Sequence, residues 1–209
     1  MKKSGFTLAE VLITLGIIGV VAALTIPTLM QKYRKNVVET RLKQVNSMLI
    51  NAAKLSEVDY GLNHVREDFA AKDPDAALEM FNKYYAPYIK FVGVKKGDEG
   101  VFGELANGSE LYFYRDRQCD ENEWSCTYLY FCEDHKYCEK IEDIDGAGKK
   151  ANNKNSFLLG AKGTTNNWAY AVYNRTQWLQ KCTNGEGESC VALLIDNGWH
   201  FPDDYPFKF

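Results

Sequence analysis

The chain has 209 residues, a formal net charge of −3 and six cysteines. This length suits one globular unit with an additional element and does not comfortably hold two domains. Lys32, Arg34 and Lys35 form the only dense basic run, which is too small for a nucleic-acid-binding surface. No nucleic-acid partner is therefore indicated.

All six cysteines lie in the C-terminal half of the chain, at Cys119, Cys126, Cys132, Cys138, Cys182 and Cys190. Their even number and their clustering predict disulfides formed in an oxidising compartment. Connectivity stays open, although the pairs Cys119/Cys126, Cys132/Cys138 and Cys182/Cys190 are each close enough to close a small loop. A zinc site is the weaker interpretation, because the chain has no CxxC pair.

The N-terminal segment at residues 6–30 is apolar except for Glu10 and is long enough to span a bilayer as a helix. It fits a cleaved secretory signal, a plain signal anchor, or a prepilin leader whose helix is retained. Lys2, Lys3 and the small residues at 21–23 suit a cleaved signal. Glu10 argues against it, since a carboxylate in hydrocarbon is costly and needs a partner.

Cleavage after Gly5 would supply that partner, because the new α-amine of Phe6 lies about one helical turn from Glu10. Between neighbouring helices the same contact would set the axial register of an assembly. The segments Lys2-Lys3-Ser4-Gly5 and Phe6-Thr7-Leu8-Ala9-Glu10 together resemble the cleavage and methylation motif of type IV prepilins and type II secretion pseudopilins. This resemblance implies that a prepilin peptidase cuts between Gly5 and Phe6 and methylates the Phe6 amine. Ala9 departs from the larger aliphatic residue often found before the glutamate.

Pro27 lies inside the predicted helix, where it removes a backbone donor and is expected to bend or loosen the preceding turn. By the resemblance, it marks a kinked and locally meltable stretch. The basic residues at 32–35 would place the C-terminal domain in the cytoplasm by the positive-inside rule. We give precedence to the cysteine cluster and the prepilin motif, which both place it outside.

The helix is predicted to continue beyond the membrane to about Glu57, with Gly61 as a stop. Apolar residues recur there at steps of four and three, at Val38, Leu42, Val45, Leu49 and Ala52. This spacing predicts one buried face of an amphipathic helix. We expect that face to pack against the protein's own globular domain.

The globular part is predicted to combine a short helix at residues 75–85, begun near Asp73 or Asp75, with an antiparallel sheet. Strands are predicted at residues 110–114, 127–131, 137–144, 168–173 and 191–195, the last joined to a further strand by a turn at Asn197-Gly198. The predicted fold class is α+β and pilin-like, with a long N-terminal helix packed on the sheet of the head. The predicted divisions are a leader at 1–5, a membrane-spanning or filament-core helix at 6–30, an amphipathic continuation at 31–58 and a disulfide-bearing head at 59–209.

A calcium loop is one interpretation of the segment that holds Asp143 and Asp145, because the two carboxylates alternate as they do in calcium-binding loops. Lys154 stands where an EF-hand has its last carboxylate, so an Asp-Gly turn between strands is the alternative. No other cofactor is indicated. The three histidines are scattered, and the chain has no nucleophile elbow, phosphate loop or HExxH motif, so no enzyme is expected.

The resemblance implies a structural subunit, a pilin or pseudopilin, of a type IV pilus-like or type II secretion filament. Its expected partners are a prepilin peptidase, other pilin or pseudopilin subunits and the inner membrane. It would cross that membrane once, with the head outside the cytoplasm, and then enter a filament or remain in the periplasm. The alternative function is a membrane-tethered extracytoplasmic binding domain that uses the leader only for sorting.

Overall fold

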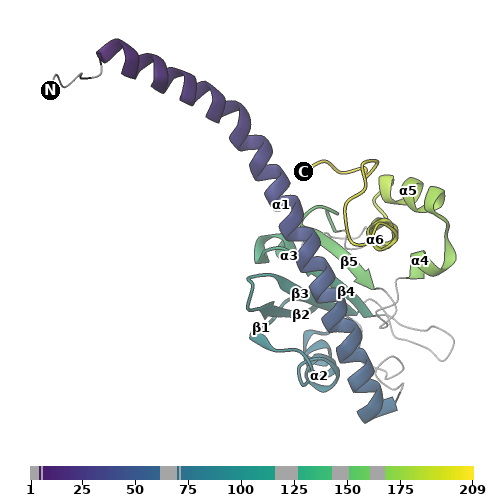
Figure 1. The fold of residues 1–209 in the computed structure, drawn as a ribbon. Helices are drawn as coiled ribbons and strands as arrows, with labels where there is room; N and C mark the ends of the chain where they lie inside the picture. Colours follow the sequence, from purple (N-terminus) through teal and green to yellow (C-terminus); the bar gives the residue numbers. More distant parts are fainter. Residues whose placement is uncertain are drawn as a thin grey trace. The chain divides into compact units, whose positions relative to one another are not determined.

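A computed structural model describes residues 5, 7–61, 70, 72–115, 127–142, 151–160 and 168–209, except for the side chains of Glu142 and Trp168. The chain forms two compact units, residues 1–37 together with Phe209, and residues 38–208. The boundary between them falls within the first helix, α1 (Leu8–Tyr60) (Figure 1). Each unit is described by itself.

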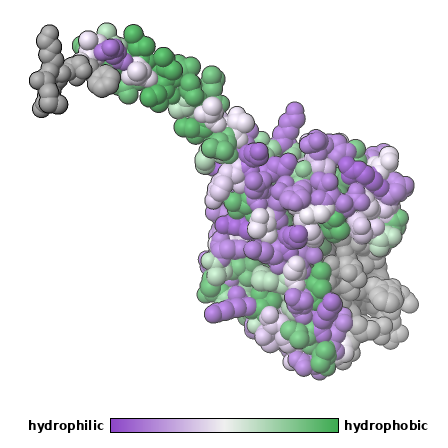
Figure 2. Space-filling model, viewed as in Figure 1, coloured by the Kyte–Doolittle hydropathy of each residue, from purple (hydrophilic) through white to green (hydrophobic). Residues whose placement is uncertain are grey.

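The first unit consists mainly of the N-terminal part of α1. Its apolar side chains face outward, with Leu8 78% exposed, Ile18 63% and Leu24 73%. Figure 2 shows these hydrophobic residues as a nearly continuous surface along the N-terminal part of the helix. By length and composition, α1 is able to cross a membrane.

The second unit contains the rest of α1, whose buried face is the predicted one. Val38, Leu42, Val45 and Ala52 are fully buried and Leu49 is 1% exposed, so the amphipathic stripe is confirmed. The helix ends at Tyr60, close to the predicted end. Gly61 follows with a φ of +67°, a conformation that glycine adopts without the strain of a side chain.

The second unit is built on a five-stranded antiparallel sheet in the order β1-β2-β3-β4-β5. The strands are β1 (Phe91–Lys96), β2 (Gly100–Leu105), β3 (Glu110–Arg115), β4 (Thr127–Cys132) and β5 (Ser156–Gly160). Each strand pairs with the next, and β3 and β4 were predicted correctly. The α+β, pilin-like fold class with a long N-terminal helix on an antiparallel sheet is therefore confirmed. Strands β1, β2 and β5 had not been predicted.

One face of the sheet carries aromatic side chains that contact helix α2 (Pro74–Tyr84). The rings of Phe81 and Phe113 lie 4.9 Å apart, and those of Tyr85 and Phe113 lie 4.8 Å apart. The helix begins as predicted, because the Asp73 carboxylate accepts hydrogen bonds from the first free backbone N–H groups and Pro74 follows at a position that needs no donor.

The opposite face of the sheet has a separate core of tyrosines. Phe102, Tyr112 and Tyr130 occupy neighbouring strands on this face and are almost fully buried. Helix α3 (His135–Glu142) covers part of it with Cys138 and Ile141. Because both faces of the sheet are covered, the central strands read as continuous apolar or aromatic runs.

Three helices complete the C-terminal region: α4 (Trp168–Val172), α5 (Arg175–Thr183) and α6 (Gly187–Asp196). Helix α6 packs against β5 and buries Val191 through Leu194. Asn174 and Gln177 form a capping box at the start of α5.

Three of the predicted strands are wrong, because residues 137–142, 168–172 and 191–195 are helical. In α3, Cys138 and Ile141 are buried one turn apart, which is a helical spacing. In α6 the apolar run has no alternation, and such a run does not by itself distinguish a buried strand from a buried helix. Packing against β5 selects the helix.

The predicted hairpin turn at Asn197-Gly198 is also wrong, since these residues end helix α6. The Gly198 N–H donates to the carbonyl of Ile195, and the Trp199 N–H donates to that of Leu194. With a φ of +65° at Gly198, this is a Schellman motif. The Asn-Gly pair suits both structures, because both require a residue with positive φ.

Candidate functional site

The N-terminal start of α1 places Glu10 in a local hydrogen-bonded cap. The Glu10 carboxylate accepts from the Thr7 N–H at 2.8 Å and from the Thr7 hydroxyl at 2.7 Å. The Glu10 N–H donates in return to the Thr7 hydroxyl oxygen at 3.3 Å. This reciprocal arrangement is a capping box, which satisfies backbone donors that have no partner within the helix. In the uncut chain, Thr7 is therefore the hydrogen-bond partner of Glu10, a contact that had not been predicted.

The predicted processing and bending residues lie in the same segment. Gly5 is exposed, whereas Phe6 lies outside the described residues. Pro27 lies within α1, and the helix continues on both sides of it. The predicted bend or loosening at Pro27, and the proposed contact between the Phe6 amine and Glu10, both stay predictions.

Two of the predicted short disulfide loops are present in the head. Cys132 bonds to Cys138, which joins the end of β4 to α3, and Cys182 bonds to Cys190, which joins α5 to α6. Cys119 and Cys126 lie outside the described residues. Each bond joins a helix to the element that precedes it in the chain.

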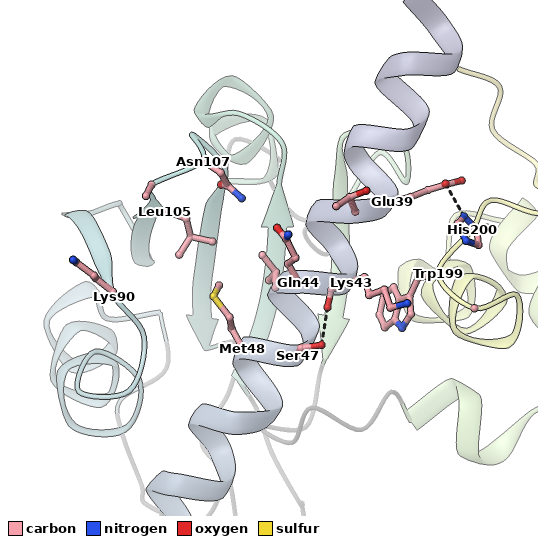
Figure 3. Close-up of a pocket in the computed structure, with 14 residues that line it drawn as sticks. Glu39, Lys43, Gln44, Ser47, Met48, Lys90, Leu105, Asn107, Trp199 and His200 are labelled. Atoms are coloured by element: carbon pink, nitrogen blue, oxygen red, sulfur yellow. Dashed lines mark hydrogen bonds and ion pairs between the residues drawn. The ribbon is translucent and has the colours of Figure 1, made fainter.

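A groove of about 820 Å³ lies in the head beside the exposed face of α1. Helix α1 contributes Thr40, Lys43, Gln44, Ser47 and Met48 to the groove. Lys90, Leu105 and Asn107 line it on one side, and Trp199 and His200 of the C-terminal turn line it on the other (Figure 3). The lining is mainly apolar and carries lysine side chains, so it is suited to a partner that is both apolar and acidic.

Glu39 fixes the C-terminal turn to α1 at one end of this groove. Its carboxylate accepts from the Phe201 N–H at 2.8 Å and lies 2.9 Å from Nδ1 of His200 (Figure 3). Glu39 is 7% exposed, whereas the His200 side chain is 72% exposed. A buried carboxylate in a folded protein requires such donors. Glu39 therefore stabilises the fold by joining the C-terminal turn to α1, a role that the apolar periodicity of α1 did not predict.

A second histidine joins α3 to the sheet on the other side of the head. His135 Nδ1 lies 2.8 Å from the Glu110 carboxylate, and its Nε2 lies 2.9 Å from that of Glu139. The hydrogen bond with Glu110, supported by the charges of Glu110 and Glu139, raises the pKa of His135 above 6.5, against the opposing effects of burial and Lys95. His135 and His200, predicted to have no catalytic partner, thus each contact a carboxylate.

The calcium interpretation is not decided, because Asp143 and Asp145 lie outside the described residues. Among the residues that are described, no group of three or more histidine, cysteine or acidic side chains is arranged to hold a metal ion. The calcium loop stays a prediction.

Comparison with known families identifies both parts of the chain. The family described as prokaryotic N-terminal methylation motif matches residues 1–26. The family described as family of unknown function, DUF6613, matches residues 28–209. The chain belongs to the DUF6613 family. Its prepilin-type N-terminus, identified from Gly5, Phe6 and Glu10, is confirmed by the first match.

A curated relative agrees with this assignment. The chain is 28% identical over 133 residues to a protein named fimbrial protein from Neisseria meningitidis serogroup B (strain ATCC BAA-335 / MC58), a match that covers 59% of this chain and 72% of that protein. No solved structure matches the chain significantly. The motif and the relative support a pilin-type subunit, a class that is structural rather than enzymatic in general, and they indicate membrane anchoring.

The residues of the candidate functional site differ in whether a sequence pattern predicts their role. Thr7 had a usable signal, because Thr-x-x-Glu before an apolar run is the pattern of a capping box. Glu39 had none, since it follows directly on the buried Val38 and its partners lie 161 and 162 residues away in sequence. The groove joins four segments that are separated in sequence, and only the fold brings them together.

Proposed function

We propose that this DUF6613 protein is a structural subunit of a type IV pilus-like filament. A prepilin peptidase cuts the chain after Gly5 and methylates the new amine of Phe6. The match of residues 1–26 to the methylation motif supports this processing, and the name of the Neisseria relative favours a pilus over a type II secretion filament. Before assembly, the chain is anchored in the inner membrane with its head outside the cytoplasm, where its disulfides form.

The observation that carries this proposal is the apolar surface along the N-terminal part of α1. Leu12, Ile13, Leu15, Ile17 and Ile18 are all 60% exposed or more, and they follow one another within two turns. Burial of one such side chain stabilises a structure by about 1.5–3 kcal/mol. Lipid covers this surface in the anchored subunit, and the parallel helices of other subunits cover it in the filament.

Glu10 has two successive partners in this function. In the unassembled subunit, its carboxylate accepts hydrogen bonds from Thr7. In the filament, the methylated amine of Phe6 on a neighbouring subunit takes its place opposite the carboxylate. The exchange replaces a neutral hydroxyl donor by a cationic one, which pairs the carboxylate charge with an opposite charge in apolar surroundings.

Mass spectrometry of the N-terminus tests the processing step. The full chain is expressed with and without a prepilin peptidase, and a Gly5→Val variant serves as the uncleavable control. We expect a mature chain that begins at methylated Phe6 only for the wild-type chain with the peptidase. Cleavage near Ala23, or no cleavage at all, would refute the prepilin function.

Substitution of Glu10 then separates a filament subunit from a tethered binding domain, the function that the groove in the head favours. We expect Glu10→Ala to be processed and inserted normally but to form no filaments, whereas Glu79→Ala, on the exposed surface of α2, assembles like the wild type. Normal filament yield from Glu10→Ala would remove the assigned role of the carboxylate. A chain that is processed but forms no filaments even as the wild type would favour the tethered binding domain.

A further inference from the structure

Basic and aromatic side chains surround α1 directly after its apolar part. Four of them follow one another without a break: Lys32, Tyr33, Arg34 and Lys35. Because successive residues of a helix point in directions about 100° apart, these side chains leave α1 on all sides. Lys32 and Arg34 are exposed, Tyr33 is 64% exposed and Lys35 is half-buried. We refer to residues 32–35 as the basic collar.

The basic collar has no role in the head or in the contacts described so far. Within the part of the chain that the structure describes, Lys32 and Arg34 form no ion pair. The positive-inside rule would place these charges on the cytoplasmic side of the membrane, whereas the proposed topology places them on the outer side. Exposed cations that depart from this rule indicate a negatively charged partner on the outer side.

The position of the basic collar along α1 matches the headgroup layer of a bilayer. The apolar residues 8–30 rise by about 35 Å along the helix. The hydrocarbon core of a bilayer is about 30 Å thick, so this segment fills the core and brings the collar to the outer headgroups. Lysine, arginine and tyrosine side chains combine an apolar stem or ring with a polar end, which suits them to this layer.

We propose that the basic collar binds the phosphate groups of anionic phospholipids in the outer leaflet of the anchoring membrane. This inference rests on the proposed function, which places the head outside the cytoplasm. Lys32 and Arg34 lie on different sides of the helix, so they bind different lipid molecules. The Arg34 guanidinium can donate to two oxygens of one phosphate, whereas the Lys32 ammonium acts as a point charge.

The lipid contact exists only while the subunit is anchored. When the subunit enters a filament, its apolar residues pass from lipid to the helices of other subunits, and the basic collar leaves the headgroups. A ligand shifts an equilibrium toward the state that it binds better. Anionic phospholipid therefore favours the anchored subunit over the assembled one, so the lipid composition of the membrane adjusts the supply of subunits.

Native mass spectrometry of the full chain released from nanodiscs tests the contact. The nanodiscs contain equal amounts of anionic phosphatidylglycerol and zwitterionic phosphatidylcholine, and the ratio of the two lipids retained on the chain is measured. We expect the wild type to retain mainly phosphatidylglycerol. Lys32→Gln and Arg34→Gln should each lower the ratio about fivefold, because each removes one positive charge at the membrane surface. A wild type without a preference, or a double Gln variant with the wild-type preference, would overturn the proposal.

Two matched variants separate the basic collar from net charge. Replacing both Lys43 and Lys90 by glutamine removes the same charge from the groove of the head and should leave the ratio unchanged. The combination of Lys32→Arg and Arg34→Lys keeps the charges of the collar and should keep the preference. A loss of preference in either variant would overturn the assignment to the charges of the collar.

Cleavage by a prepilin peptidase, measured on the same nanodiscs, distinguishes this inference from the proposed function. Normal cleavage after Gly5 without a preference for phosphatidylglycerol would refute the lipid contact alone. A preference for phosphatidylglycerol without cleavage would support the lipid contact and refute the proposed processing.

Discussion

Two parts of the same helix, residues 8–30 and residues 38–56, bury their apolar side chains in different ways. In the first part the large apolar residues are exposed on the subunit by itself, and in the second they form a stripe that is fully covered by the head. The first part is apolar on all sides, whereas the second alternates polar and apolar residues with helical spacing. Figure 2 shows the corresponding change in surface hydropathy.

The difference shows that helix formation and helix burial are separate properties of this chain. The backbone conformation is the same in both parts, so the arrangement of side chains alone decides whether the helix is covered by its own chain or by something else. The head already covers the apolar side chains in the second part of α1. The apolar side chains in the first part still require lipid or further subunits to cover them. Four predictions test this division, from the largest effect to the smallest.

The largest effect is expected from truncation of a buried apolar residue in the second part of α1. Leu42→Ala leaves a cavity in the core and should lower the free energy of unfolding of the head by about 2–5 kcal/mol. Leu15→Ala, at a position that is 61% exposed, should leave that free energy unchanged. Urea unfolding of the full chain in detergent, followed by tryptophan fluorescence, measures both. Equal losses for the two variants would contradict the division of the helix.

The second prediction concerns the covalent links of the head, which the first part of α1 lacks. Replacing Cys182 and Cys190 by alanine removes the bond between α5 and α6 and should cost about 2–3 kcal/mol, because the loop that it closes is short. The same unfolding experiment under oxidising conditions measures the loss, with the reduced wild-type chain for comparison. A double variant as stable as the oxidised wild type would show that packing of α6 alone holds this region.

The third prediction tests where along α1 the head begins. Glu39→Ala leaves the Phe201 N–H without its acceptor and should lower the free energy of unfolding by about 1–3 kcal/mol. Glu39→Gln retains an acceptor for that N–H and should lose less. Hydrogen exchange should show the effect first at residues 199–201. Unchanged exchange at Phe201 in the alanine variant would mean that the aromatic contact of Phe201 with Phe157 holds the turn without Glu39.

Sequence patterns predict the secondary structure correctly where the same pattern of buried and exposed residues continues over many positions. The helix that begins at Leu8, the buried stripe from Val38 to Ala52 and the strands β3 and β4 were each predicted correctly. They fail for α3, α4 and α6, whose aromatic and aliphatic residues suit a strand and a helix equally. The choice between the two depends on contacts with β4 and β5 that are not encoded locally.

The candidate site follows the same rule. Gly5, Phe6 and Glu10 form a motif that lies within six consecutive residues, so residues 1–26 suffice to identify it. The groove joins residues of α1, the β2–β3 turn and the end of α6, and no spacing in the sequence connects them. Glu39 shows the difficulty most clearly, since a buried carboxylate on a helix looks like any exposed glutamate until its partners from the C-terminal turn are known.

The smallest effect is expected at His135, on the face of the sheet away from α2. Its raised pKa means that the folded head binds the imidazole proton more tightly than the unfolded chain. The added stability is therefore fully present below pH 6.5 and is lost as the pH rises through the higher pKa of the folded state. We expect the difference in unfolding free energy between the wild type and His135→Gln to be larger at pH 5.5 than at pH 9, by about 1 kcal/mol or less because the histidine is partly exposed. A difference that is independent of pH would show that His135 contributes only through packing and the single N–H of its neutral ring. Residues 8–30 contain no histidine, so removal of His135 should also leave membrane anchoring unchanged over this pH range.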